Sequence, residues 1–269
     1  MKLELLVPTM HKDHNGIVEL FHKMNIHSDV LFANQCDDEW NEEFEIDGYS
    51  VRVISTKTRG VSVNRNILLK NFKADFGLYM DDDGVMNETY QREVLDFVKK
   101  NNDAKFIKFN FTLSSKDDDR PHYLIKKTKK AKYTDVSPFG MPGFMIARDV
   151  AQKENVLFDE KIGVPNYISH GEDSVFIKLM FNLKVPTYVS TIYIGHINNE
   201  DSTWFKDFDE RYFVSQGYLY TAMHGKWYML FILRMYFIHH KEYNKYKLKS
   251  VIKFAKKGHA MFIGGKNYD

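Results

Sequence analysis

The sequence predicts an α/β fold in which helices flank a central, mostly parallel sheet, followed by a helical C-terminal extension. Strand-like and helix-like segments alternate over about the first hundred residues, which is typical of a doubly wound sheet. Residues 76–80 form a short apolar run that ends at three consecutive aspartates. From residue 206 onward the apolar positions have helical spacing. We therefore expect a catalytic-type domain over residues 1–205 and a helical, basic extension over residues 206–269.

The individual elements follow from periodicity and from turn residues. Apolar runs predict strands over residues 3–7, 29–33, 49–54, 76–80, 105–111 and 144–147. Helical spacing predicts helices over residues 15–24, 62–71 and 87–100, and another that starts at about residue 171. Pro8 is expected to end the first strand, Asn15 to cap the first helix, and Asp47-Gly48 to turn a hairpin.

Composition excludes several classes of protein. The chain has 269 residues, 43% of them hydrophobic and 15% aromatic, which is enough for a sizeable core. A net charge of +2 does not indicate a nucleic-acid binder. Cys36 is the single cysteine, so no internal disulfide forms and a reducing compartment is expected. The N-terminal apolar run is too short for a signal peptide, and no window is apolar enough to span a membrane, so we expect a cytoplasmic protein.

The acidic run Asp81-Asp82-Asp83-Gly84 is the strongest chemical signal in the sequence. Three adjacent carboxylates repel one another unless a cation lies among their oxygens, and a divalent metal with a phosphate behind it suits such a site. A solvated acidic turn is the alternative. A calcium loop of the EF-hand type is excluded because its fifth, sixth and twelfth positions would be Val85, Met86 and Arg92.

Four motifs stand in an informative order along the chain. They are Val7-Pro8-Thr9 after the first strand, Arg59-Gly60 with Asn64-Arg65-Asn66 at a helix start, the acidic run, and Gly171-Glu172-Asp173. Their order and spacing resemble the nucleotide-sugar glycosyltransferases of the GT-A fold, family 2, over roughly residues 3 to 200. With Asn34-Gln35 after the second strand, the pattern is similar to that of bacterial capsule and cell-surface polysaccharide enzymes.

The resemblance implies a metal-dependent site for a UDP-sugar. Asp81 and Asp83 would hold Mn²⁺ or Mg²⁺, with Asp82 in support and Asp81 also near the ribose; all-oxygen ligation suits these two metals. His196 falls where some relatives supply a further metal or diphosphate contact, although a lone histidine near a strand end is more often structural. The remaining donor contacts implied by the family pattern come from Pro8, Thr9, Asn34, Asp37 or Asp38, Arg59 and Arg65.

Two of these roles have more than one assignment. Asp37 and Asp38 compete as the acid that reads the nucleobase, and Gln35 could share that role. Arg65 could pair with a phosphate or with the acidic run itself, and a simple surface ion pair is the structural alternative.

The resemblance assigns the chemistry of transfer to Glu172 and Asp173. Asp173 would be the general base that deprotonates the acceptor hydroxyl, and Glu172 would position the acceptor or the base. Burial and an acidic neighbour raise the pKa of such an aspartate, which suits it to this task. The expected outcome is inversion at the anomeric carbon. Structurally, two acids at the start of a helix could simply complement its dipole.

Two other functions compete with a glycosyltransferase. A nucleotidyltransferase would also use clustered carboxylates and a metal, but residues 9–14 lack the Gly-rich, basic loop that holds a triphosphate. A carbohydrate-binding or scaffold protein could retain the fold without activity.

At the C-terminus, lysines between residues 245 and 257 alternate with apolar positions. They predict either a helical pair that closes the core or a basic amphipathic element on an anionic membrane at the inner face of the cell.

Overall fold

A computed structural model describes residues 1–114, 124–163, 168–198, 208–243 and 245–264. The chain forms two compact units. The first comprises Met1–Arg59, Val63–Phe158 and Phe176–Ser202, and the second comprises Gly60–Ser62, Asp159–Val175 and Thr203–Asp269. The domain boundary at residue 205 stays a prediction; the contacts group the segment before α6 with the C-terminal helices.

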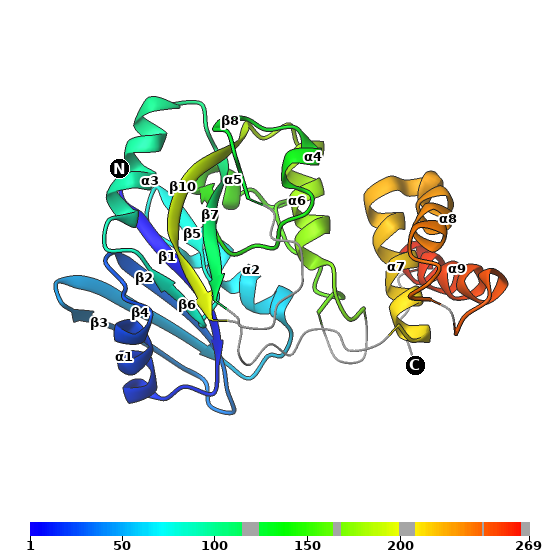
Figure 1. Cartoon of the computed structure of the whole chain (residues 1–269). Helices are drawn as coiled ribbons and strands as arrows, with labels where there is room; N and C mark the ends of the chain where they lie inside the picture. The colour runs from blue at the N-terminus through cyan, green and yellow to red at the C-terminus, as the bar shows by residue number, and fades with distance from the viewer. Residues whose placement is uncertain (115–123, 164–167, 199–207, 244, 265–269) are drawn as a thin grey trace. The chain divides into compact units, whose positions relative to one another are not determined.

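Within the described residues, the first unit is built on a ten-stranded sheet (Figure 1). The strand order is β3-β4-β2-β1-β5-β9-β7-β10-β6, with β8 also paired to β10. The pairs β1–β2, β1–β5, β2–β4 and β7–β10 are parallel, and the other pairs are antiparallel. The strands are β1 (Leu3–Met10), β2 (Asp29–Gln35), β3 (Trp40–Ile46), β4 (Tyr49–Thr56), β5 (Phe76–Tyr79), β6 (Gly84–Met86), β7 (Phe106–Ser114), β8 (Lys129–Lys130), β9 (Phe144–Ala147) and β10 (Thr187–Asn198).

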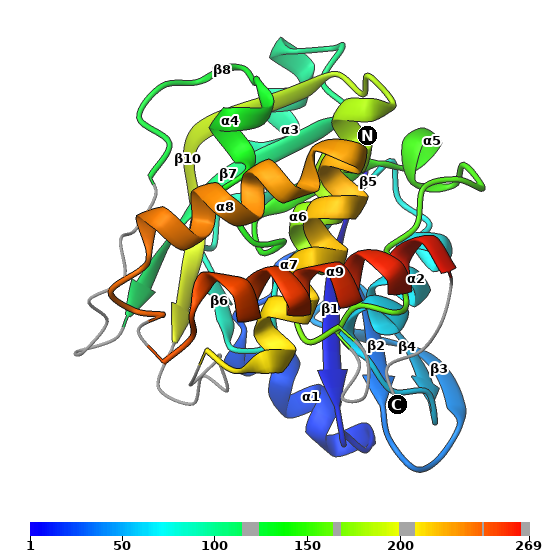
Figure 2. The ribbon, with the colours of Figure 1, turned by 90° about the vertical axis from the view of Figure 1, so that its right-hand side faces the viewer.

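Helices cover both faces of this sheet (Figures 1 and 2). Successive side chains of β7 point to opposite faces. Phe106 accordingly packs edge-on against Phe176 of α6, while Phe109 packs edge-on against Phe97 of α3. Helices α3 and α6 therefore lie on opposite faces of the sheet. The helices are α1 (His14–Lys23), α2 (Val61–Asn71), α3 (Tyr90–Lys100), α4 (Tyr133–Val136), α5 (Arg148–Ala151) and α6 (Glu172–Asn182).

The α/β prediction is confirmed, but two local predictions are wrong. β1 continues through Pro8 to Met10 instead of ending there. The pairing of β1 with β5 stops at Leu6. Pro8 has no N–H to donate on that side of β1, and among the described residues no strand lies there to accept a hydrogen bond, so proline is tolerated. The cap of α1 is Asp13, whose Oδ1 accepts a hydrogen bond from Gly16 N at 2.8 Å, and Asn15 lies inside the helix. The long strand β10, which carries His196, was not predicted.

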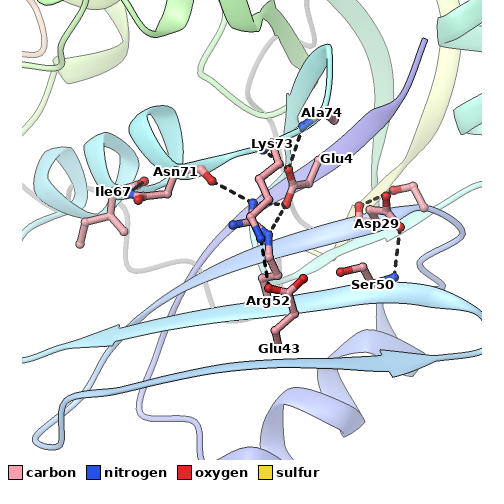
Figure 3. Close-up of polar contacts among 10 residues, drawn as sticks. Glu4, Asp29, Glu43, Ser50, Arg52, Ile67, Asn71, Lys73 and Ala74 are labelled. Atoms are coloured by element: carbon pink, nitrogen blue, oxygen red, sulfur yellow. Dashed lines mark hydrogen bonds and ion pairs between the residues drawn. The ribbon is translucent and has the colours of Figure 1, made fainter.

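A buried ion pair ties β1 to β4 (Figure 3). Glu4 is 3% exposed, and its Oε1 accepts hydrogen bonds from Arg52 Nε at 3.1 Å and Nη2 at 2.6 Å. Its Oε2 accepts from the backbone N–H groups of Lys73 at 2.7 Å and Ala74 at 3.3 Å. Four donors thus satisfy one buried carboxylate, and they connect two strands to the segment between α2 and β5.

Replacing Arg52 with leucine is expected to destabilise the protein by about 3 kcal/mol, because a carboxylate would stay buried without its cation. Lys73→Ala is the matched control: Lys73 Nζ contacts Glu43 at 3.1 Å, but both side chains are exposed, so the cost is expected below about 1 kcal/mol. The double variant Glu4→Met, Arg52→Leu should recover most of the loss. Urea unfolding measures all three, and equal costs for the two single variants would contradict the assignment.

The second unit contains a cluster of C-terminal helices, α7 (Glu210–His224), η1 (Gly225–Trp227), α8 (Tyr228–Ile238) and α9 (Leu248–Gly264). The backbones of α7 and α9 touch at two glycines. A Cβ on Gly217 would lie 2.1 Å from Ala255 O, and one on Gly258 would lie 1.9 Å from Val214 O. Only glycine permits this approach. Among the described helices, none combines the length and the apolar character that crossing a bilayer would require.

Candidate active site

The carboxyl ends of β1, β2 and β5 meet at one edge of the sheet, because these strands are parallel neighbours. Thr9 pairs in register with Asn34, and the acidic turn, residues 81–84, follows β5 directly. Thr9 Oγ1 donates a hydrogen bond to Asp82 Oδ2 at 2.7 Å. Two of the motifs that the sequence placed 73 residues apart are therefore in direct contact.

The acidic turn has a fixed backbone. Gly84 N donates to Asp81 O at 3.0 Å, which closes a four-residue turn. A Cβ on Gly84 would lie 2.6 Å from both Cγ and Sδ of Met80, so glycine allows the chain to turn tightly against this buried side chain. The turn thereby presents three carboxylates at the end of β5.

Asp83 carries the clearest electrostatic signal of this turn. Partial burial, reinforced by the neighbouring charges of Asp81 and Asp82, raises its pKa to about 6. Its Oδ1 is buried and has no hydrogen-bond partner among the residues that the structure describes. A hydrogen bond from the backbone of Asp83 and the charge of Lys23 oppose this rise without cancelling it. An ionised carboxylate in these surroundings is stabilised by an additional cation.

Arg65 lies beside the acidic turn and is almost fully buried. Its Nη2 is 3.8 Å from Asp81 Oδ1, and its guanidinium lies 5.8 Å from the centroid of the Phe158 ring. Tyr79 Oη donates to Arg65 O at 3.3 Å, which fixes this turn of α2 against β5. The contact with the acidic turn is one of the two pairings considered for Arg65, and the contact with a phosphate stays a prediction. The separation is longer than the 2.7–2.9 Å of a close charge-assisted bond.

Two asparagines hold the strand ends in place. Asn34 is fully buried; its Oδ1 accepts from Lys12 N at 3.1 Å, and its Nδ2 donates to Lys12 O at 2.7 Å. Asn64 Nδ2 donates to Ala33 O at 2.9 Å and to Thr9 O at 3.3 Å, so α2 is joined to the ends of β1 and β2. The role of Lys12 had no signal in the sequence, because it acts through its backbone.

The predicted base-reading acids lie beyond the end of β2. Arg59 Nη2 donates to Asp37 Oδ1 at 2.6 Å, and Arg59 Nη1 donates to Cys36 O at 3.0 Å. The side chain of Asp37 is nevertheless 87% exposed. Asp38 is held through its backbone, since its carbonyl oxygen accepts from Cys36 Sγ at 2.9 Å and from Ser55 Oγ at 3.2 Å. Both carboxylates thus come from one short, fixed segment.

His196 lies on β10, the strand that pairs with β6. It is opposite Val85, two residues after Asp83, and is half-buried. This pairing therefore brings His196 to β6, the strand that directly follows the acidic turn. Among the described residues, no group of three or more His, Cys, Asp and Glu side chains is arranged to hold a metal by itself.

Glu172 and Asp173 form the first turn of α6, as predicted for a helix start, and they belong to the second unit. The residues before them are fixed on α7. Ser169 N donates to Ser215 Oγ at 3.2 Å, and Gly171 has a φ of +99°, a conformation that favours glycine. A Cβ on Gly171 would lie 2.3 Å from Leu219 Cδ1. Helix α7 thus supports the segment that leads into the acidic pair.

His170 makes several of the contacts that hold this segment on α7, and its role was not predicted from the sequence. Its Nδ1 lies 2.8 Å from Ser169 Oγ, its Nε2 lies 2.9 Å from the side-chain amide of Gln216, and its ring stacks on Tyr212 with centroids 5.2 Å apart. Burial lowers the pKa of His170, against the opposing charges of Glu172 and Asp209. The imidazole is therefore neutral at pH 7, and it can accept one hydrogen bond and donate another.

A comparison with protein families finds a glycosyltransferase match over a segment that includes the acidic turn. Residues 32–154 match the family model described as "Glycosyl transferase family 2". This segment includes Asn34, Asp37, Asp38, Arg59, Arg65 and the acidic turn. Over this segment the chain is similar to family 2 glycosyltransferases, and the resemblance predicted from the motifs is confirmed. No curated protein sequence matches the chain.

Solved structures of TarS from S. aureus are similar in fold. The chain matches TarS 1–349 in complex with UDP-GlcNAc with a TM-score of 0.60 and 14% identity, over 82% of this chain and 66% of that one. The complex with UDP gives a TM-score of 0.59 and 14% identity over 82% and 65%. A longer TarS structure gives 0.59 and 14% over 88% and 44%. The chain therefore spans slightly less than two thirds of TarS 1–349.

Proposed function

We propose that the protein is a metal-dependent, inverting glycosyltransferase that moves a sugar from a UDP-sugar to a hydroxyl of a glycan or lipid-linked acceptor in bacterial surface polysaccharide synthesis. The observation that supports this most directly is the acidic turn, which lies at the carboxyl end of β5 and inside the matched family segment. Ligands of open α/β sheets bind at this edge. The structural neighbours bound to UDP-GlcNAc and UDP are consistent with the donor class.

The residues of the acidic turn fit a divalent metal. Asp83 offers a buried oxygen without a partner among the described residues, and repulsion from Asp81 and Asp82 favours a cation there. Mg²⁺ and Mn²⁺ prefer oxygen ligands, and Mg²⁺ is commonly held by one or two carboxylates with substrate phosphates and water. A complete protein cage is therefore unnecessary. Asp81 and Asp83 would hold the metal, with His196 as a further candidate, and the bound metal would neutralise the leaving diphosphate.

The donor contacts would come from the strand ends. Thr9, held against Asp82, and Pro8 on β1 would line one side of the uridine, and Asp37 or Asp38 beyond β2 would read the base. Asn34 is already bonded to the backbone of Lys12, so it would act by fixing that segment. Arg59 would orient Asp37. Arg65 would share its charge between Asp81 and the diphosphate.

Asp173 would act as the general base that accepts the proton of the acceptor hydroxyl as the hydroxyl oxygen attacks the anomeric carbon. Attack from the face opposite the leaving UDP inverts the configuration. Glu172 would position the acceptor or the base. The neutral His170, bonded to Ser169 and near Gln216, holds the preceding residues on α7, which fixes the position from which Asp173 acts.

The proposal is tested by incubating the full chain with UDP-sugars, Mn²⁺ and acceptor candidates and measuring the released nucleotide. UDP release that requires Mn²⁺ and rises with acceptor is expected. Pyrophosphate release would indicate a nucleotidyltransferase instead. Calorimetry gives a second readout: UDP should bind with Mn²⁺ and much more weakly without it, and failure to bind UDP under either condition would favour a non-catalytic carbohydrate-binding or scaffold role.

The place of action is part of the same proposal. A lipid-linked acceptor would require the protein to work at a membrane surface. We infer a cytoplasmic protein that contacts the inner face of the cell membrane through its C-terminal helices, whose segment 225–264 contains nine Lys and Arg residues and a single Glu.

A further inference from the structure

Helix α8 has apolar side chains on two faces, and only one face is used by the core. Tyr228, Ile232 and Met235 are buried in the cluster that includes Phe213 of α7 and Val251 of α9. Those residues account for the packing of α8 within the second unit. The apolar residues on the opposite side have no such role, so they require another explanation.

The opposite side, here called the α8 outer face, consists of Trp227, Leu230, Arg234, Phe237 and Ile238. The four apolar members are 58%, 56%, 63% and 55% exposed, respectively. At 100° per residue, all five fall within an arc of about 100° around the helix axis. They therefore form one continuous stripe along α8. Helix α8 is the orange helix in Figure 2.

The charges around the stripe are mostly positive, and the one acidic residue of segment 225–264, Glu242, follows its C-terminal end. Residues 225–241 contain Lys226, Arg234 and Lys241 and no acidic residue. Lys226 Nζ lies 5.4 Å from the centroid of the Trp227 ring, so a cation and the indole occupy one end of the stripe together. Arg234 lies in the middle of the stripe, where its long stem can keep the charged end in water.

We propose that the α8 outer face is a membrane-contacting surface that inserts shallowly into an anionic bilayer. Trp, Phe and Leu on one side of a helix with nearby cations are the composition of helices that lie in the headgroup region. Trp favours the bilayer–water boundary, and each cation near an anionic surface adds attraction. With 11 residues α8 is too short to cross a bilayer, so it lies along the surface. This inference rests on the proposed function in one respect: the proposed lipid-linked acceptor is the reason for the protein to approach a membrane.

The proposed membrane-contacting surface on α8 differs from the basic segment, residues 245–257, that the sequence suggested. The lysines of residues 245–257 lie mainly on α9 and supply charge, whereas α8 supplies the apolar stripe that enters the headgroup region. Lys257 of α9 is moreover within 3.6 Å of Glu210. Removal of α9 would also disrupt its contact with α7 at Gly217, so truncation is a poor test and point variants on α8 are needed.

The test is co-sedimentation of the full chain with vesicles of phosphatidylglycerol and phosphatidylcholine, compared with vesicles of phosphatidylcholine alone. The wild type should bind the anionic vesicles, and the double variant Leu230→Ser, Phe237→Ser should bind at least about tenfold more weakly. Arg234→Gln should weaken binding by about fivefold. Leu157→Ser, at an exposed leucine of the first unit, is the matched control and should bind as the wild type does.

Fluorescence of Trp227 separates insertion from simple charge attraction. Its emission should shift to shorter wavelength on anionic vesicles and be quenched by lipids brominated near the headgroup, and Trp227→Phe should lose most of that change. Equal vesicle binding by wild type and the double variant would overturn the proposal. So would a wild-type dimer in solution that the double variant abolishes, because a second copy would then cover the stripe. No donor or acceptor is present, so these results are independent of the glycosyltransferase assignment.

Discussion

Asp83→Asn is expected to reduce the affinity for Mn²⁺ in the presence of UDP by on the order of 10²-fold or more, and to reduce UDP release accordingly. The variant keeps the size of the side chain but removes the charge of the carboxylate that carries the unpartnered oxygen. Calorimetric titration of Mn²⁺ into protein with UDP measures the affinity. Asp47→Asn is the matched control, because Asp47 also precedes a glycine in a turn, between β3 and β4, away from the acidic turn.

The same variant separates metal binding from folding. Because the pKa of Asp83 is raised to about 6, its ionisation disfavours the folded state, and this penalty grows between about pH 4 and pH 6. Without metal at pH 7.5, Asp83→Asn should therefore melt no lower than the wild type. In the wild type, protons compete with Mn²⁺ below about pH 6, so its affinity should be about tenfold lower at pH 5 than at pH 7. Unchanged Mn²⁺ affinity in the variant would remove Asp83 from the proposed metal site.

Asp173→Asn is expected to reduce turnover by about 10²-fold or more, because an amide cannot accept the proton of the acceptor hydroxyl. Binding of UDP with Mn²⁺ should not change, since the acidic turn is intact. The measurements are the initial rate of UDP release at saturating donor and acceptor, and the dissociation constant of UDP with Mn²⁺. Unaltered turnover would show that the base is another residue, while loss of UDP binding as well would point to a folding defect.

A companion variant tests the support that α7 gives to Asp173. His170→Phe keeps a ring that can stack on Tyr212 but removes both nitrogens that face Ser169 and Gln216. It should lower kcat by about tenfold or more through misplacement of the base, with the UDP affinity preserved. Tyr236→Phe removes a hydroxyl elsewhere in the same unit, whose hydrogen bond to Tyr246 O is 3.3 Å long, and serves as the control.

Several of the candidate site residues could be predicted from the sequence, because the side chains that carry the chemistry are adjacent in the chain. The acidic turn follows a short apolar strand, and the parallel arrangement of β1, β2 and β5 was implied by alternating strands and helices. The parallel strands bring Thr9 and Asp82 to the same edge, where their side chains are 2.7 Å apart. The local signals for Glu172 and Asp173 likewise placed them at a helix start.

Other features could not be predicted, because they depend on which backbones approach one another. The insertion of β9 antiparallel between β5 and β7 follows no local pattern. Pro8 reads as a strand terminator, and only the early end of the β1–β5 pairing explains why β1 continues past it. His170 has no motif of its own; its role arises from Gln216 and Tyr212, more than 40 residues later in the chain.

By itself the sequence determined the α/β class, the family 2 resemblance and the carboxylates proposed for metal and base, because these depend on local periodicity and on the identity of neighbouring residues. Only the tertiary structure decided which carboxylate is partly buried, which side chains hold the strand ends, and which face of α8 remains exposed. Burial and contact are properties of groups brought together from distant parts of the chain, and no short segment encodes them alone.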